Sequence, residues 1–386
     1  MPGLTSDSPE HRAIRETVAG IAERYGSQYF LERGRTGGDI EELWKDLGVA
    51  GLLGLHLPEE YGGGGGGMSE AVVVVEELAA HGMPLLIWVI SPAICGSILA
   101  HHGSHEMKQQ WLPAIADGTR KMAFGLTEPD AGSNSHNVKT TAERTATGWK
   151  ISGAKYYISA IDQCDAVLVV TRDAEHSTPD KPRLSLFVVP TDAPGLTLQR
   201  IDTAIVSPDK QFTVFLDDVE VGEDALIGTA GNGLRQVFDG LNPERILVGA
   251  LCSGIGRYAI GKAADYAKER TVWSTPIGAH QGVAHPLAES HIAVELGRLA
   301  TVRSAELFDA GESAGEAANI AKFAASEAAL KALDQAIQTH GGNGLSHEYG
   351  LSELWFVTRL MRTAPVSREM VLNFIAQTSL GLPRSY

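Results

Sequence analysis

The hydrophobic pattern of this 386-residue chain changes its period twice, and this constrains the fold more than any single motif does. Over residues 11–117 apolar side chains recur at helical spacing, with charged residues between them. Over residues 121–231 they alternate in short runs separated by Gly, Pro and Asp, which is typical of strands. Helical patterns resume after Gly233. This order predicts an α+β protein with three domains, over residues 1–120, 121–232 and 233–386.

Individual helices and strands follow from composition as well as from period. Four runs rich in β-branched and aromatic residues are predicted strands: Trp149–Ile151, Ala166–Thr171, Leu184–Val189 and Gln211–Leu216. Ala317–Gln338 is a predicted helix, because alanine has the highest helix propensity. Glu70–His81 is also a predicted helix. Its run of four valines, Val72–Val75, lowers helix propensity, and we expect burial to override that.

Two segments of the first domain allow more than one interpretation. The six glycines Gly62–Gly67 suggest a phosphate loop, but no Lys-Ser/Thr pair follows and no strand clearly precedes them. We therefore expect a flexible connector, with Ser69 as the N-cap of the next helix. Met83–Ala100 lacks charge and approaches the length of a membrane span. Because Pro84 and Pro92 interrupt it, we expect a buried helical hairpin instead.

Length and composition narrow the class of protein. The chain is too long for one compact core, and its net charge of -15 with no stripe of Lys and Arg argues against nucleic-acid binding. Cys95, Cys164 and Cys252 lie far apart without CxxC spacing, which indicates a reducing compartment and no metal site. The N-terminus mixes acidic and basic residues before any apolar run. We expect a cytoplasmic, bacterial protein with no membrane partner.

The segments Thr127–Asn134 and Tyr156–Ser159 carry the clearest chemical signal. A loop of small and hydroxyl residues that leaves a strand can offer backbone N–H groups and hydroxyls to a bulky planar ligand. An aromatic residue beside a hydroxyl on a later strand can cover one face of that ligand and reach its edge. Each segment alone also fits a simpler interpretation, a Pro-Asp-Ala-Gly turn and an ordinary strand.

Together these segments closely resemble the flavin-binding segments of the acyl-CoA dehydrogenase family. Further blocks like those of the family follow in the expected order: Asn242–Arg245, Glu269–Arg270, His280–Gln281 and Gln338–Gly344. The resemblance therefore covers nearly the whole chain. It implies an N-terminal helical domain, a middle β-barrel or sandwich domain and a C-terminal four-helix bundle.

The resemblance implies FAD as the cofactor. It assigns contacts on the isoalloxazine side to Phe124, Leu126, Thr127, Gly132, Ser133, Tyr157, Ile158 and Ser159. The backbone near Leu126 and Thr127 would meet the pyrimidine edge, and Ser133 would lie near the pyrophosphate and the thioester ligand. Tyr157 stands where the family usually has tryptophan and Ser159 where it usually has threonine; Asn134 replaces a common aspartate. These changes keep an aromatic face and a hydroxyl, and leave the flavin potential open.

Other residues of the resemblance would reach the cofactor from a neighbouring subunit. They are Arg270, Trp273, Gln281, Gln338 and Gly342. An arginine suits phosphate because its planar fork pairs with two oxygens. Taken alone, Arg270 also fits a helix C-terminus, and the glycine run after Gln338 fits a helix stop. The family assignment implies a homotetramer, a dimer of dimers, in which protomers share the cofactor.

The catalytic base is the main departure from the common family pattern. Desaturation next to a thioester needs a base for the α proton, and many members carry it in a C-terminal Tyr-Glu-Gly-Thr motif. Here Ala364–Ser367 holds no acid, and Glu369 would project from a different helix face. Another branch, which includes isovaleryl-CoA and some long-chain dehydrogenases, carries the base on an earlier helix. Glu244 matches that position.

Local sequence around Glu244 has a purely structural interpretation as well. Asn242 is a good N-cap, Pro243 a good first helical residue, and a glutamate in the first turn is favoured by the helix dipole. Because the C-terminal acid is missing, we predict that Glu244 is the base, with a pKa raised by burial. Arg245 is predicted to line the same cavity and, with Ser133, to contact the substrate.

The resemblance implies FAD-dependent α,β-dehydrogenation of an acyl-CoA to the trans-2-enoyl-CoA. Hydride would pass to flavin N5, and an electron-transfer flavoprotein would accept the electrons. Two alternatives stay open: an acyl-CoA oxidase that uses O2, and a non-catalytic subunit of a heteromeric acyl-CoA dehydrogenase.

Overall fold

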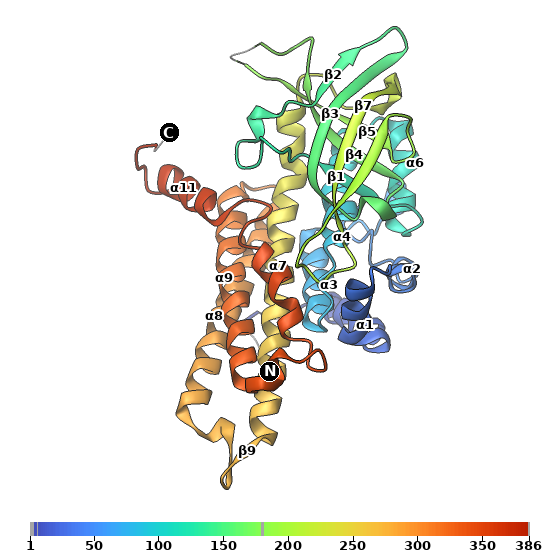
Figure 1. The fold of residues 1–386 in the computed structure, drawn as a ribbon. Coiled ribbons are helices and arrows are strands. Elements are labelled where there is room, and N and C mark those ends of the chain that lie inside the picture. Colours follow the sequence, from blue (N-terminus) through green and yellow to red (C-terminus); the bar gives the residue numbers. More distant parts are fainter. Residues whose placement is uncertain (1–3, 6, 179–180, 385–386) are drawn as a thin grey trace.

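A computed structural model describes residues 4–5, 7–178 and 181–384, and it confirms the α+β class, with a sheet that follows one helical region in the chain and precedes another (Figure 1). The first region is a layer of helices that packs against both the sheet and the last region. Its helices are α1 (Pro9–Thr36), α2 (Glu41–Val49), α3 (Met68–Ala80), α4 (Leu86–Trp88), the π-helix η2 (Val89–Gly96), α5 (Ser97–His102) and α6 (His105–Ala116). The predicted helix over 70–81 is confirmed by α3.

The glycine-rich loop before α3 is compact, and the predicted cap at Ser69 is wrong. A Cβ added at Gly63 would lie 2.1 Å from a backbone carbonyl oxygen, so the loop needs glycine for close packing rather than as a loose connector. The N-cap of α3 is Gly67, whose N–H donates to the Glu70 carboxylate (2.7 Å). The carboxylate of Asp309 accepts from the Ser69 N–H (2.9 Å), so a residue distant in sequence provides the capping group.

The segment predicted as a buried hairpin is instead one continuous buried helix made of α4, η2 and α5. Pro92 lies inside the π-helical stretch. A proline removes one backbone donor, and here the helix widens locally rather than turning back. The Met122 N–H of the first strand donates to Ser91 Oγ (3.0 Å), which fixes η2 against the sheet.

The middle region is a single mixed sheet of eight strands. They are β1 (Met122–Gly125), β2 (Thr141–Arg144), β3 (Gly148–Ser159), β4 (Ala166–Asp173), β5 (Leu184–Pro190), β6 (Leu196–Ile201), β7 (Gln211–Gly222) and β8 (Leu226–Ile227). The order is β6-β7-β3-β2-β4-β5-β8, with β1 parallel to β4. All four predicted strands lie within β3, β4, β5 and β7.

The two faces of β4 are both buried, but in different surroundings. Val167 and Val169 pack in the core that includes strands β3 and β7, whereas Leu168 and Val170 pack in the core of α5 and α6. Trp149 of β3 and Phe187 of β5 have ring centroids 5.2 Å apart although these strands are not neighbours in the sheet. The sheet therefore folds over on itself and holds its own core.

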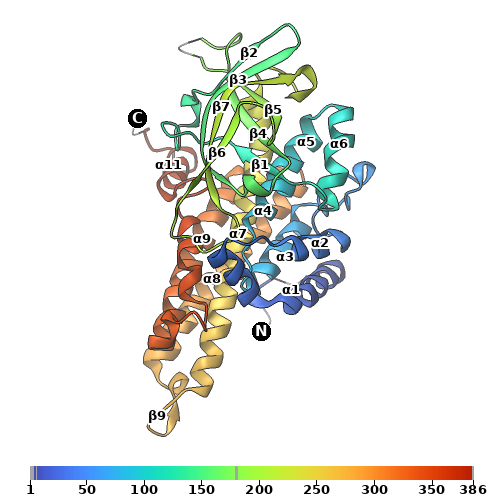
Figure 2. The same ribbon diagram turned by 45° about the vertical axis from the view of Figure 1, so that its right-hand side comes forward.

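The last region contains three long helices that run side by side away from the sheet (Figure 2). They are α7 (Gly233–Glu269), α8 (Gln281–Asp309) and α9 (Gly315–His340), followed by the short α10 (Trp355–Leu360) and α11 (Arg368–Thr378). The short strands β9 (Thr271–Val272) and β10 (Thr275–Pro276) form a hairpin between α7 and α8. The predicted Ala-rich helix is confirmed by α9, whose buried alanines face α7 and α8.

A buried carboxylate ties the first helical region to the last. Glu76 of α3 is 1% exposed and accepts from the Arg298 Nε of α8 at 2.8 Å. Arg257 of α7 and Arg15 of α1 also pair with it. Because a buried charge is costly unless paired, this cluster fixes how the four helices meet. Within the described residues, no helix has the length and apolar character required to cross a membrane.

Candidate active site

The loop after β1 is held to β3 by its own backbone. The Tyr156 N–H donates to the Thr127 carbonyl (2.8 Å), and Glu128 and Ala131 exchange two backbone hydrogen bonds of 3.2 Å across the Pro129-Asp130 turn. Pro and Asp both favour turns, so the presence of these residues at its centre agrees with the expected turn. Beyond it, Gly132 and Ser133 are exposed, and a Cβ added at Gly132 would meet no atom within 4 Å. The loop thus presents an open backbone to solvent.

A buried ion pair supports this loop from beneath. Lys155 is fully buried, and its Nζ donates to Glu128 Oε1 (2.8 Å) and to the Leu126 carbonyl (3.2 Å). Burial lowers the pKa of Lys155 to about 8, against the opposing effect of Glu128. Burial also disfavours the ionised Glu128, but the Lys155 ammonium together with hydrogen bonds from Thr140 and the Lys139 backbone lowers the pKa of Glu128. Neither the buried Lys155 nor its pairing with Glu128 was predicted from the sequence, although Glu128 lies in the segment Thr127–Asn134.

The end of β3 bends so that one aromatic ring faces outward. The pairing of β3 with β7 shifts between Lys155 and Ile158, and Tyr157 has a φ of 57°. A non-glycine residue in this region stores strain, which is typical of functional sites. The Tyr157 ring is 52% exposed and contacts Tyr156 edge-on, while Ile158 is buried. Ser159 Oγ donates to Gln211 Oε1 (2.9 Å), so its hydroxyl is already oriented.

Glu244 lies in the interior of α7, about three turns after its start at Gly233, and not in a first helical turn. The helix begins at Gly233 and continues through Pro243, so the predicted N-cap at Asn242 is wrong. Gly240, one turn earlier, packs so closely on η2 and α5 that an added Cβ would lie 2.8 Å from Ile98. Because residues four apart share a helix face, Glu244 faces the same neighbours. Packing along the whole helix, and not the local start signal, determines where α7 begins.

The Glu244 carboxyl lies in a weakly polar environment. Its side chain keeps partial access to solvent, yet dense protein surrounds it, and burial raises the pKa of Glu244 to about 7. The charges of Arg245 and Lys322 oppose this shift. Burial raises the pKa of the Cys95 thiol well above its ordinary value, and Glu244 adds to that effect. The Cys95 Sγ in turn donates to the Ala123 carbonyl of β1 (3.5 Å).

Helix η2 packs against both α7, which carries Glu244, and β1, which leads into the loop. Phe124 lies on β1 and Leu126 directly after it, and both are partly buried against the same core as η2. The structure therefore brings together the start of the predicted flavin loop and the α7 face that carries Glu244.

Arg245, the next residue of α7, is held by one hydrogen bond and one aromatic ring. Its Nη1 donates to Asn242 Oδ1 (3.0 Å), and its guanidinium lies 5.9 Å from the centre of the Phe238 ring. The Arg245 Nε is buried and has no hydrogen-bond partner among the described residues. Burial lowers the pKa of Arg245, and Glu244 opposes that shift. An unpaired buried donor beside a carboxylate fits a site that receives a polar ligand group.

The turn over residues 364–367, where many family members carry the base, is hydrogen-bonded to α9. Ala364-Pro365 is a cis peptide bond, and the Val366 carbonyl accepts from Lys322 Nζ (2.6 Å). Ser367 is the N-cap of α11, with its Oγ accepting from the Met370 N–H. Glu369 follows in the first turn, with a side chain that is 73% exposed. Glu369 thus points to solvent, as expected for a residue outside the site.

The residues predicted to act from a neighbouring subunit lie together at the end of the long helices that is far from the sheet. Arg270 is the C-cap of α7, Trp273 at the hairpin tip is 92% exposed, and Gln281 begins α8. Gln338 and Gly342 lie at the end of α9, which is fixed beside α7 by ring stacking of His340 on Tyr266 at 4.3 Å. Arg270 and the glycine run therefore do end helices, as their structural interpretations required. The hairpin and the sheet lie at opposite ends of the molecule (Figures 1 and 2).

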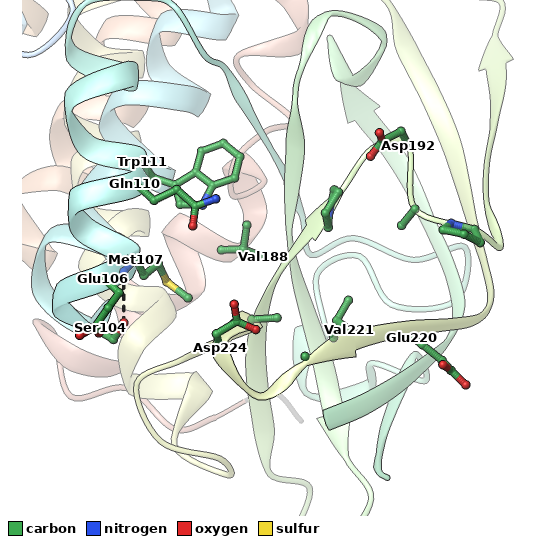
Figure 3. A pocket seen from close by; sticks show the side chains of 15 residues that line it. Ser104, Glu106, Met107, Gln110, Trp111, Val188, Asp192, Glu220, Val221 and Asp224 are labelled. Atoms are coloured by element: carbon green, nitrogen blue, oxygen red, sulfur yellow. Dashed lines mark hydrogen bonds between the residues drawn. The ribbon is translucent and has the colours of Figure 1, made fainter. Parts of the chain in front are cut away.

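A separate cleft of about 490 Å³ lies between α6 and the outer edge of the sheet (Figure 3). Trp111, Gln110 and Met107 of α6 face Val188 of β5 and Asp224 across it. None of the predicted site residues lines this cleft. This cleft is therefore distinct from the candidate site.

Comparisons with known proteins agree with the geometry. Profiles described as acyl-CoA dehydrogenase N-terminal, middle and C-terminal domains match residues 8–119, 123–219 and 231–380. The acyl-CoA dehydrogenase FadE12 of Mycobacterium tuberculosis is 56% identical over 98% of both chains. A solved glutaryl-CoA dehydrogenase complex with glutaryl-CoA is 26% identical, with a TM-score of 0.93 over 99% of this chain and 98% of that one. Butyryl-CoA dehydrogenase from Megasphaera elsdenii, 24% identical, shares the fold, with a TM-score of 0.92 over 98% of this chain and 100% of that one. The chain belongs to the acyl-CoA dehydrogenase family, and it is an enzyme of that family.

Proposed function

We propose that the enzyme uses FAD to convert an acyl-CoA to its trans-2-enoyl-CoA, with Glu244 as the base. The observation that carries the proposal is the position of Glu244: a carboxyl on α7 with a pKa raised to about 7 by burial, connected through η2 to the loop after β1. A general base works best when its pKa lies near the working pH, because it is then partly ionised and can also release the proton.

The reaction removes two hydrogens from adjacent carbons. Glu244 takes the α proton while the electron pair of that C–H bond forms the new double bond, and the β hydrogen leaves with its own pair. FAD, when bound, supplies the acceptor for that hydride. Acidifying the α carbon requires hydrogen bonds to the thioester oxygen, and we assign one to a backbone N–H in the Ala364–Ser367 turn.

The residues of the loop and of β3 fit a flavin. The exposed Tyr157 ring would cover one face, and the Ser159 hydroxyl would reach its edge. The open backbone at Gly132 and Ser133 leaves room for a pyrophosphate or thioester group. The remaining flavin contacts that we propose within the same chain come from Phe124, Leu126, Thr127 and Ile158.

A second copy of the chain would complete the cofactor site. Arg270, Trp273, Gln281, Gln338 and Gly342 lie far from the loop of their own chain and are exposed. On α8, the exposed residues Ile292, Leu296 and Leu299 recur at helical spacing and form an apolar stripe. Such a stripe on a soluble protein indicates a contact surface. We propose a homotetramer in which each cofactor is shared between two protomers.

Substitution of the base tests the reaction. Glu244→Gln keeps the shape of the side chain and removes its basicity, so we expect FAD and acyl-CoA binding to persist. Flavin bleaching by acyl-CoA under anaerobic conditions should slow by roughly 10³-fold or more. Glu369→Gln is the matched control and should bleach at the wild-type rate, since Glu369 is exposed. Near-normal bleaching in the Glu244 variant would remove Glu244 from the mechanism.

The route of the electrons needs a separate measurement. We propose an electron-transfer flavoprotein as acceptor, and reduced enzyme should then reoxidise slowly in air with little peroxide. Rapid reoxidation with stoichiometric peroxide would indicate an oxidase instead. A colourless, inactive protein after expression alone would favour a non-catalytic subunit.

A further inference from the structure

Helix α9 holds the Ala364–Ser367 turn at three points. The Lys322 ammonium donates to the Val366 carbonyl (2.6 Å) in the middle of the turn. Glu327, further along α9, accepts from the Arg362 Nε at 2.8 Å and from the Arg368 Nε at 2.9 Å, just outside its two ends. The turn therefore depends on two charged side chains of one helix.

The two anchors differ in burial. The Glu327 side chain is one-third exposed, so its pairs with arginine are surface interactions of modest strength. Lys322 is 1% exposed, and the partner that its Nζ contacts at hydrogen-bond distance is a carbonyl, not a carboxylate. Burying an ammonium in this way is costly, so a role beyond packing is required to explain it.

The groups that act on the Lys322 ammonium are Glu244, Arg245 and Cys252 of α7 and Glu327 of α9 itself. In turn, Lys322 and Arg245 are the two charges that act on the Glu244 carboxyl. Burial lowers the pKa of Lys322 to about 8, against the opposing effects of Cys252 and Glu244. The ammonium is therefore still mostly charged at neutral pH, where Glu244 must be ionised to accept a proton.

We propose that Lys322 is a positioning residue for the Glu244 site: it fixes the Val366 turn beside the base, and its charge favours the ionised carboxylate. This inference depends on the role of Glu244 proposed above. It explains why a lysine occupies the alanine-lined face of α9. It also assigns separate functions to the two anchors, since Glu327 holds the turn without acting on the base.

Removing the charge should shift the titration of Glu244 in a known direction. A nearby cation stabilises the ionised carboxylate, so Lys322→Met should raise the pKa of Glu244 by roughly one unit. Lys322→Arg keeps the charge and should leave that pKa close to wild type. Glu327→Gln should leave it unchanged, while hydrogen exchange of the backbone over residues 362–368 becomes faster.

The experiment is an infrared pH titration of the Glu244 carboxyl in the full-length protein, with Glu244→Gln spectra subtracted to isolate its C=O band. Hydrogen exchange by mass spectrometry monitors the turn in the same variants. An unchanged Glu244 titration in a folded Lys322→Met protein would overturn the inference, as would an equal shift in Glu327→Gln. If Lys322→Met does not fold, a shift of one unit in Lys322→Arg would also overturn it.

Failure of the proposed reaction would be distinguishable from failure of this inference, because the titration requires no substrate. If no acyl-CoA bleached the wild-type flavin while Lys322→Met shifted the titration as expected, the reaction would be wrong and the assignment of Lys322 would hold.

Discussion

The two halves of the proposed cofactor site differ in how firmly contacts within one chain fix their structure. The near half, residues 126–133 and 157–159, is held by a buried ion pair and by backbone hydrogen bonds to neighbouring strands. The far half lies at the other end of the long helices, where Trp273 is 92% exposed. One half is therefore shaped before the cofactor arrives, whereas the other is presented outward.

The two halves also differ in how much their side chains matter for the free energy of folding. In the near half, Lys155 and Glu128 are both buried, and each would be costly without the other. In the far half, exposed side chains cost little to leave free, and their order can come from contact with a second protomer. Substitutions at the buried supports of the near half, Lys155 and Glu128, should therefore affect both folding and binding. Those in the far half should affect binding alone.

The largest expected effect is on FAD binding by Gly132→Val. An added Cβ meets no atom within 4 Å in this structure, so the apoprotein should keep its stability. The side chain would occupy the space proposed for the cofactor, and FAD affinity should fall by roughly 10³-fold, about 4 kcal/mol, in fluorescence titrations. Unchanged FAD affinity would place the cofactor elsewhere.

Mixing two defective proteins sharpens this prediction. Arg270→Ala should weaken FAD binding by removing a phosphate contact from the far half, and exposed Lys268→Ala is its matched control. After co-refolding, an Arg270→Ala protomer supplies an intact near half and a Gly132→Val protomer an intact Arg270. Such mixtures should recover tight FAD sites. Absence of recovery would contradict the shared site.

The next effect concerns stability. Lys155→Met leaves the Glu128 carboxylate buried without its cation, and we expect a loss of about 3–5 kcal/mol in the free energy of unfolding. Lys139→Met removes an exposed pair with Asp130 and should change the free energy of unfolding very little. Urea denaturation of the apoproteins measures both. Equal losses would show that the near half is not specially supported.

The smallest effect is a pH dependence of stability that arises from Glu244. Its folded pKa of about 7 exceeds its ordinary value of 4.5, so the folded state binds the proton more tightly. Stability should therefore fall as pH rises from about 4.5 to 7, by on the order of 1–3 kcal/mol relative to Glu244→Gln. Denaturation midpoints of both proteins across this range test it. A difference that grew in the opposite direction would mean that Glu244 is ionised by its neighbours.

Much of the fold was predictable because long patterns average over local exceptions. The β-branched apolar run of β4 and the alanine content of α9 each reflect many residues, and both elements were predicted correctly. The errors came from single-residue signals. Pro243 and Pro92 usually end helices, but in this protein packing along α7 and a π-helical stretch accommodate them.

The candidate site was partly predictable for a different reason. Glu244 could be selected by resemblance, but the buried lysines that support the site carry no motif. For Lys322 a weak signal existed: it lies four residues after Ala318 and three before Ala325, both buried on α9. A charge within a buried helical stripe could therefore have been noticed. Lys155 and its partner Glu128 depend on a bend in β3 that local sequence does not reveal.

The exposed apolar stripe on α8 has a consequence for how FAD occupancy depends on the concentration of the enzyme. If association of chains and retention of FAD are one linked equilibrium, dilution should release flavin even when free FAD is held constant. Occupancy would then rise more steeply than linearly with protein concentration. The fraction of the enzyme that carries FAD would then be low at low protein concentration and high above the concentration at which the chains associate.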